Sequence, residues 1–171
     1  LRSLELKDGR LYYIEPGKPI FAGKYLDEAE VRAVGTTLDR MALVFSLLDE
    51  AARKGASSQP NNMEKGISNT GTYLPQLRYL TQCLQARAFF LATHGDVRGA
   101  AAAVETQLGI VKCGHAYRSL IGSLVGIACE GITIGTVESL PLASFTEDDL
   151  LRIEAALRRL PDLESAWVSA I

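Results

Sequence analysis

The sequence lacks any block of like charge. Its 171 residues contain 18 Lys and Arg against 20 Asp and Glu, and the net charge of −2 comes from both signs spread along the chain. Proteins that bind nucleic acids carry a basic patch or stripe that neutralises phosphates, and no such footprint is present. The glycines form neither a GxGxxG motif nor a Walker-type loop. The sequence therefore gives no support to nucleic-acid or nucleotide binding.

Cysteines are few, and their spacing does not suit a metal centre. The three residues Cys83, Cys113 and Cys129 form no CxxC pair and no Cys/His ligand spacing. If Cys83 and Cys113 lie on two helices that turn near Gly95, their heights along the helix axes differ by about 9 Å. That separation is too large for a disulfide. We interpret all three as small core residues, and we expect no metal site and no cofactor.

Candidate catalytic groups are also scarce. The stretch Cys113-Gly114-His115 brings a thiol and an imidazole together in sequence, but a nucleophile also needs a third group that orients its base, and none is evident. Asp148 and Asp149 begin a predicted helix, where the helix dipole explains acidic residues better than metal binding does. The sequence predicts no catalytic residue, so we expect a domain that is not an enzyme by itself.

No hydrophobic run is long and clean enough for a membrane span. The most apolar stretch, Ser119 to Val137, carries four glycines and is interrupted by Glu130, whereas a span needs about 20 apolar residues. Nothing near Leu1 resembles a signal peptide. We interpret the stretch as a buried central helix and expect no direct insertion of this domain into a membrane. One side of this helix consists of Ile121, Leu124, Val125, Ala128 and Ile132, and Leu120, Ile127 and Ile134 extend the apolar surface around it.

One short-range signal near the amino end predicts β structure. Within residues 1–15, an Asp8-Gly9 pair stands between two short alternating runs, the pattern of a two-residue hairpin turn. This turn pairs Leu6 with Leu11 and places apolar side chains of both strands on one face. Because an isolated hairpin is only marginally stable in water, we expect this face to rest on the helices.

Helical periodicity dominates the remainder of the chain. Residues 27–54 predict one long helix, which begins at a capping box formed by Asp27 and Glu30. Its apolar side consists of Val31, Val34, Leu38, Met41, Phe45, Leu48 and Ala52. Residues 55–71 are rich in Gly, Ser and Asn and predict a long surface loop.

Residues 72–160 predict antiparallel helical hairpins. Apolar residues recur at spacings of three and four on both sides of Gly95-Asp96, where one helix ends and the next is capped. Two GxxxG spacings, which start at Gly122 and Gly131, leave shallow notches in the apolar helix. We expect these notches to serve close packing inside the fold.

The end of the sequence carries an unfinished helical pattern. Residues 162–171 begin an amphipathic helix that stops after two turns, and the chain opens with Leu1 rather than Met. We therefore expect a fragment of a longer chain. Residues 1–171 are predicted to form a single domain of the all-α class, with about six helices in antiparallel hairpins and a short β-hairpin at the amino end.

The segment from Ala86 to Ala100 resembles the middle of a tetratricopeptide repeat. The small Ala88, the Gly95-Asp96 turn and Ala100 stand at the spacings that this repeat uses for close helix contact and for its corner. The resemblance covers about one repeat, without the flanking aromatic and proline positions and without a second copy at the 34-residue period. It implies a TPR-like superhelix of antiparallel helix pairs.

Residues 74–161 contain a Gly-Asp helical hairpin that leads into an apolar LVGIA segment, here residues 124–128. In this pattern the chain resembles a group of uncharacterised bacterial helical proteins. The resemblance implies no reaction, substrate or catalytic residue. It does imply a location, because proteins of that appearance are often membrane-tethered or exported.

Five side chains outside the predicted apolar stripes form a candidate binding surface: Tyr79, Arg87, His94, Tyr117 and Glu130. Aromatic residues in a curved helical array can line a peptide groove, although a second layer of core is their ordinary role. A histidine such as His94, at the end of a helix, ordinarily satisfies the last carbonyls. Glu130 is either a solvent-facing charge or a buried acid paired with Arg87 or Arg118.

The architecture favours a protein-interaction or scaffold domain that binds an unidentified protein or peptide. The alternative is a helical domain that binds a small molecule between its helices, as an accessory part of a larger enzyme. A scaffold needs an extended groove, whereas a ligand domain needs an enclosed pocket with convergent polar groups. A homodimer is a third interpretation, because a second chain can cover the GxxxG notches and the unfinished final helix.

Overall fold

The computed structural model describes residues 4–14, 23–54, 74–115, 120–158 and 160. These residues form six α-helices and one three-stranded antiparallel sheet at the amino-terminal end. The prediction of a mostly helical chain with about six helices and a short β element is thus confirmed. The predicted loop over residues 55–71 and the predicted helix over residues 162–171 lie outside the described residues.

The sheet contains the predicted hairpin and one further strand. Its strands are β1 (Leu4–Lys7), β2 (Arg10–Ile14) and β3 (Gly23–Tyr25), in the order β1-β2-β3. Leu6 pairs with Leu11 as predicted. Asp8 and Gly9 have φ values of 51° and 69°, which is the left-handed backbone pair that a tight two-residue hairpin turn requires. The strand β3 was not predicted from the sequence.

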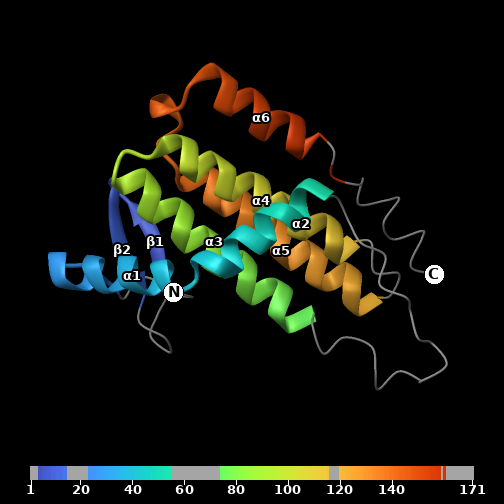
Figure 1. The fold of residues 1–171 in the computed structure, drawn as a ribbon, viewed down its shortest axis with the longest axis horizontal. Helices are drawn as coiled ribbons and strands as arrows, with labels where there is room; N and C mark the ends of the chain where they lie inside the picture. The colour runs from blue at the N-terminus through green and yellow to red at the C-terminus, as the bar shows by residue number, and fades with distance from the viewer. Residues whose placement is uncertain (1–3, 15–22, 55–73, 116–119, 159, 161–171) are drawn as a thin grey trace.

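Three antiparallel helices form the centre of the fold (Figure 1). The helices are α1 (Glu28–Arg40), α2 (Ala42–Lys54), α3 (Leu74–Thr93), α4 (Val97–His115), α5 (Leu120–Ser139) and α6 (Glu147–Leu157), and a 3-10 turn, η3 (Leu142–Ser144), precedes α6. The helices α3, α4 and α5 pack against one another, α2 crosses this bundle, and α6 packs on α4. Leu6 and Leu11 share one buried cluster with Phe89 and Val104 of the bundle. The hairpin therefore rests on the helices, as expected.

The predicted long helix over residues 27–54 is wrong in one respect, because the structure divides it into two helices. Met41 separates α1 from α2 and has φ −92° and ψ 4°. The predicted apolar side still points inward in both halves, with Leu38 and Phe45 buried. The bend at Met41 lets α1 pack on α3 while α2 packs on α4. A single straight helix over residues 27–54 would contact the bundle along only part of that helix.

The predicted capping box is present at the beginning of α1. The Asp27 side chain accepts a hydrogen bond from the Glu30 N–H at 2.8 Å, and the Glu30 side chain accepts one from the Asp27 N–H at 3.0 Å. Lys24 of β3 also donates a hydrogen bond to Glu30. The Lys24 hydrogen bond, followed by the Asp27 N–H, lowers the pKa of Glu30 below its usual value. This carboxylate therefore links the sheet to α1.

We expect the beginning of α1 to lose protection in acid, and Glu30→Gln to remove this response. Because the folded-state pKa of Glu30 is lowered, its stabilisation is complete above the unfolded-state pKa and is lost as the pH falls through the folded-state pKa. A glutamine side chain still accepts from the Asp27 N–H but does not titrate. Amide hydrogen exchange of α1 between about pH 6 and pH 3 measures the effect. An identical acid response in the variant would contradict it.

Candidate functional site

The fully buried residues of the helix α5 are small or polar, and three of its large aliphatic residues are exposed. Its buried side consists of Gly122, Ser123, Gly126, Cys129, Thr133 and Thr136. Ile121, Leu124 and Ile134 are 50%, 51% and 43% exposed. Gly131 and Gly135 lie on the same side of the helix as these three exposed residues, and an added Cβ at either glycine would meet no atom within 4 Å. We call these five residues the α5 outer face. The expectation that the predicted apolar side is buried is wrong for Ile121 and Leu124, whereas Val125 of the same side packs against the core.

Close backbone contact between α4 and α5 explains this orientation. A Cβ on Gly114 would lie 2.8 Å from the Cα of Gly126, and a Cβ on Gly126 would lie 3.0 Å from the His115 ring. Only a side of α5 with small residues permits α4 to approach so closely. The GxxxG spacing that starts at Gly122 is therefore packed inside the fold, as predicted, whereas the spacing that starts at Gly131 lies outside this contact.

Glu130 pairs with a histidine at the same crossing. The Nε2 atom of His115 lies 3.4 Å from Oε2 of Glu130, and the two side chains are 2% and 20% exposed. Glu130 is thus a largely buried and paired acid, but its partner is His115 instead of Arg87. Arg118, the other predicted partner, lies outside the described residues. The pair adds a polar contact that fixes the height of α5 against α4.

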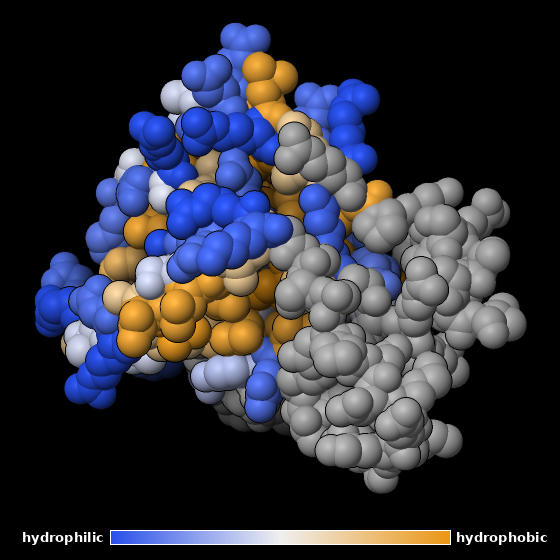
Figure 2. Space-filling view, turned by 45° about the vertical axis from the view of Figure 1, so that its right-hand side comes forward, coloured by the Kyte–Doolittle hydropathy of each residue, from blue (hydrophilic) through white to orange (hydrophobic). Residues whose placement is uncertain are grey.

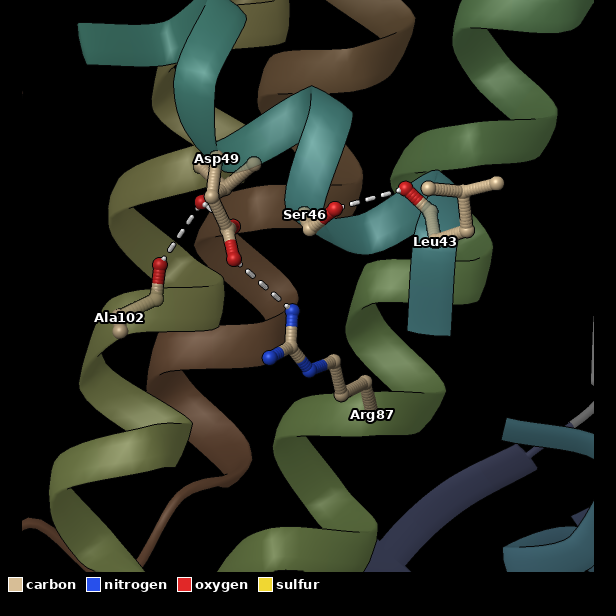
Figure 3. A network of polar contacts seen from close by, with 6 residues as sticks. Leu43, Ser46, Asp49, Arg87 and Ala102 are labelled. Carbon is tan, nitrogen blue, oxygen red and sulfur yellow. Dashed lines mark hydrogen bonds and ion pairs between the residues drawn. The ribbon is translucent and has the colours of Figure 1, made fainter. Parts of the chain in front are cut away.

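Arg87 belongs to a polar cluster that ties α2 to the bundle. Its Nη1 lies 3.4 Å from Oδ2 of Asp49, while Thr106 donates a hydrogen bond of 2.6 Å to Oδ1 of the same carboxylate. The guanidinium also lies 4.8 Å from the centre of the Phe45 ring, a cation–π contact. Figure 3 shows the Asp49 side chain on α2 directed toward Arg87. Arg87 is therefore engaged in holding α2 on α3.

The remaining predicted binding residues do not gather at one place. Tyr79 is 38% exposed near the beginning of α3. His94 follows the end of the same helix, about 22 Å further along its axis, and its Nδ1 lies 2.8 Å from the Phe90 carbonyl oxygen. This contact agrees with the expectation for a histidine that ends a helix. Tyr117 lies outside the described residues.

The helix α2 carries a second exposed apolar area. Leu43, Val44 and Leu47 are 72%, 38% and 57% exposed. Figure 2 shows that hydrophobic side chains reach the surface on the side of the molecule that α2 covers. Contiguous apolar residues at the surface of a folded domain often mark an interaction site. The two helices α2 and α5 therefore each present large aliphatic side chains to the solvent.

A cleft of about 520 Å³ lies between α2, α4 and α6. Its charged lining residues are Asp49, Arg53, Glu105, Lys112 and Arg152. The volume falls within the range of small-molecule sites in proteins. The cleft could not be predicted from the sequence, because its lining residues come from three helices that are far apart in the chain.

The described cysteines do not have the character of reactive thiols. Burial raises the pKa of the Cys113 thiol above its usual value. Burial also raises the pKa of Cys129, although a hydrogen bond with Thr81 acts in the opposite direction. A raised pKa keeps a thiol protonated, whereas a nucleophilic cysteine needs a lowered one. Cys83 and Cys129 are fully buried core residues, as predicted, whereas Cys113 is only partly buried.

The spacing of the small residues in the sequence indicates the orientation that α5 has in the structure. The small residues Gly122, Gly126 and Cys129, followed by Thr133 and Thr136, recur at spacings of four and three. That spacing places them on one side of a helix as surely as an aliphatic stripe would. Small residues at helical spacing indicate a side that a neighbouring helix approaches closely.

Comparisons with known proteins leave the geometry as the basis for any functional argument. No protein-family model, curated protein or solved structure matches this chain. The resemblance to a tetratricopeptide hairpin therefore stays a prediction.

Proposed function

We propose that this domain is a non-catalytic protein-interaction module that docks its partner on the α5 outer face. The observation that supports this is the exposure of Ile121, Leu124 and Ile134 on a helix that buries small residues instead. Full burial of one large aliphatic side chain is worth about 1.5–3 kcal/mol. A partner that covers this face recovers that free energy, and these three side chains form the apolar centre of the interface.

The shape of the face favours a helix as the partner. Gly131 and Gly135 leave open space where other residues would place a Cβ. Such a notch beside Ile134 allows the backbone of a second helix to approach closely, with its own aliphatic side chains on either side. The partner is therefore an apolar helix of another protein or of a second copy of this chain.

The buried side of α5 supports a protein partner over a lipid one. Contrary to the prediction from the sequence, the segment Ile121–Ser139 is long and apolar enough to cross a membrane by length and composition alone. Its inner side, however, holds the Gly114–Gly126 contact and the His115–Glu130 pair. Transfer into a bilayer would break both contacts and bring Glu130 into hydrocarbon, which is costly for a charged side chain.

We infer further that α3 and α4 form a hairpin of the tetratricopeptide type. Ala88 and Ala100 are both 0% exposed, as the close helix contact of that repeat requires. Gly95 has a φ of 81° at the corner, and Asp96 caps α4 by accepting a hydrogen bond of 2.8 Å from the Gly99 N–H. These features support a repeat-like hairpin from which α5 continues the array.

The test places the same substitution at two equally exposed leucines. Leu124 on α5 is 51% exposed and Leu151 on α6 is 52% exposed, so neither Leu→Asp variant should alter the stability of the free domain by much. We expect Leu124→Asp to weaken the partner's affinity about 100-fold or more, because a desolvated apolar contact becomes a buried charge. Leu151→Asp should leave the affinity unchanged.

Immobilised wild-type domain and both variants are incubated with an extract of the source cells, and the captured partner is then purified and titrated by calorimetry. Sedimentation equilibrium over a concentration series covers the case in which the partner is a second copy. A dimer that Leu124→Asp dissociates, and Leu151→Asp does not, would identify that case. Loss of binding in both variants, or in neither, contradicts docking on the α5 outer face.

A further inference from the structure

The cleft between α2, α4 and α6 has a defined floor and two walls. The helices α2 and α6 both pack against α4 (Figure 1), and the cleft is lined by residues of all three helices. The floor consists of Ala102, Glu105, Thr106, Leu108, Gly109 and Lys112. Asp49, Ala52 and Arg53 line the α2 wall, and Arg152, Ala155 and Ala156 line the α6 wall.

Small residues keep this cleft hollow. Ala102 and Ala155 are exposed at its surface. At one side of the floor, a Cβ on Gly109 would lie 2.6 Å from the Cβ of Ala52, so α2 reaches the backbone of α4 there. Together with Ala156, these residues give one part of the cleft an apolar surface. Such a surface suits the carbon body of a small organic molecule.

The charges around the cleft have an excess of positive sign. Arg53, Lys112 and Arg152 come from three different helices, and none of them has an ion-pair partner among the residues that the structure describes. Of the two lining acids, Asp49 is already engaged by its contacts with α3 and α4. Glu105 is therefore the one lining acid that can offset the three positive charges. A cleft that concentrates one sign of charge attracts ligands of the opposite sign.

The helix dipole accounts for two of these cations but not for the third. Arg53 and Lys112 stand in the last turns of α2 and α4, where positive charge stabilises a helix. Arg152 is the sixth of the eleven residues of α6, beyond the first turn with its three acidic residues. The helix dipole has little effect at this middle position, and Arg152 forms no ion pair with the acids that the structure describes. Its positive charge is therefore available to a ligand in the cleft.

We propose that this cleft binds a small organic anion with an apolar body. Arg152 of the α6 wall and Lys112 of the floor hold its carboxylate or phosphate group, and Arg53 of the α2 wall adds a third positive charge. The apolar body lies on Ala102, Gly109 and the alanines of α6. The site is separate from the α5 outer face, so the two proposals stand or fall independently.

Isothermal titration calorimetry of the whole chain tests this with three probes of similar size. The probes are phenyl phosphate, phenylacetate and the neutral benzyl alcohol. We expect saturable binding of one or both anions with a Kd below about 1 mM, and no saturable binding of the alcohol. The stronger of the two anions identifies the head group as phosphate or carboxylate. Absence of saturable binding for both anions, or equal binding of the alcohol, overturns the proposal.

Matched variants locate the binding in the cleft. Arg152→Gln should weaken the anion's affinity about tenfold, because a charged hydrogen-bond donor is lost, and Ala155→Phe should abolish binding by filling the cleft from an exposed position. Arg98→Gln is the control, since Arg98 is exposed at the other end of α4, about 21 Å from Lys112 along the helix. Thermal unfolding of the free variants reports any structural effect separately. Equal weakening by Arg98→Gln and Arg152→Gln contradicts the site.

Discussion

The substitution Phe89→Ala is expected to lower the free energy of unfolding by about 3–5 kcal/mol, because it leaves a large cavity in the core. Phe89 is 1% exposed and belongs to the buried cluster that also contains Leu6 and Leu11 of the sheet and Val104 of α4. One side chain thus joins three parts of the fold. Urea unfolding followed by circular dichroism measures the loss.

The matched control for this prediction is Leu43→Ala on α2. Leu43 is 72% exposed, so its truncation should change the free energy of unfolding by less than about 0.5 kcal/mol. Amide signals of β1, β2 and α3 should also disappear in one transition, because they share the cluster around Phe89. A sheet that unfolds well before the helices would show that the hairpin rests on the bundle less firmly than its burial indicates.

The hairpin and most helices could be predicted from the sequence because local chemistry determines them. The Asp8-Gly9 pair fixes a two-residue turn and hence the Leu6–Leu11 pairing. The Asp27 capping box fixes where α1 begins. The break at Met41 has no such local cause, since neither Gly nor Pro stands near it. The break lets α1 pack on α3 and α2 on α4, and a periodic pattern of apolar residues does not contain this tertiary arrangement.

The orientation of α5 could not be derived from hydrophobicity because nearly its whole circumference is apolar. A search for aliphatic periodicity selects Ile121 and Leu124 as the inward side. In the structure, the size of the side chain decides instead, because Gly114 of α4 needs Gly126 opposite it. The same contact turns the aliphatic residues toward the solvent. The proposed docking face is thus a consequence of how closely α4 approaches.

The cleft was beyond the reach of the sequence for a different reason. Arg53 and Lys112 are each explained by the end of their own helix, so neither stands out along the chain. Only the packing of α2 and α6 on α4 brings them to the same cavity as Arg152. A binding site that is formed by three separate helices has no short motif.

The orientation of α5 is itself open to a direct test, since Gly114→Val is expected to destabilise the domain by about 3 kcal/mol. A Cβ at this position would lie 2.8 Å from the Cα and 3.1 Å from the backbone nitrogen of Gly126. Backbone atoms cannot move aside as a flexible side chain can, so α4 and α5 must separate. Chemical denaturation of the purified variant measures the loss of stability.

Gly131→Ala on the outer side of α5 should have the opposite effect. No atom lies within 4 Å of the added Cβ, so the helix gains only the propensity difference between Ala and Gly, up to about 1 kcal/mol. The signs of the two effects therefore report which side of α5 faces the bundle. If Gly114→Val were tolerated as well as Gly131→Ala, α5 would have to be rotated. Leu124 would then belong to the core, and the docking face would have to lie elsewhere, with the exposed leucines of α2 as the remaining apolar surface.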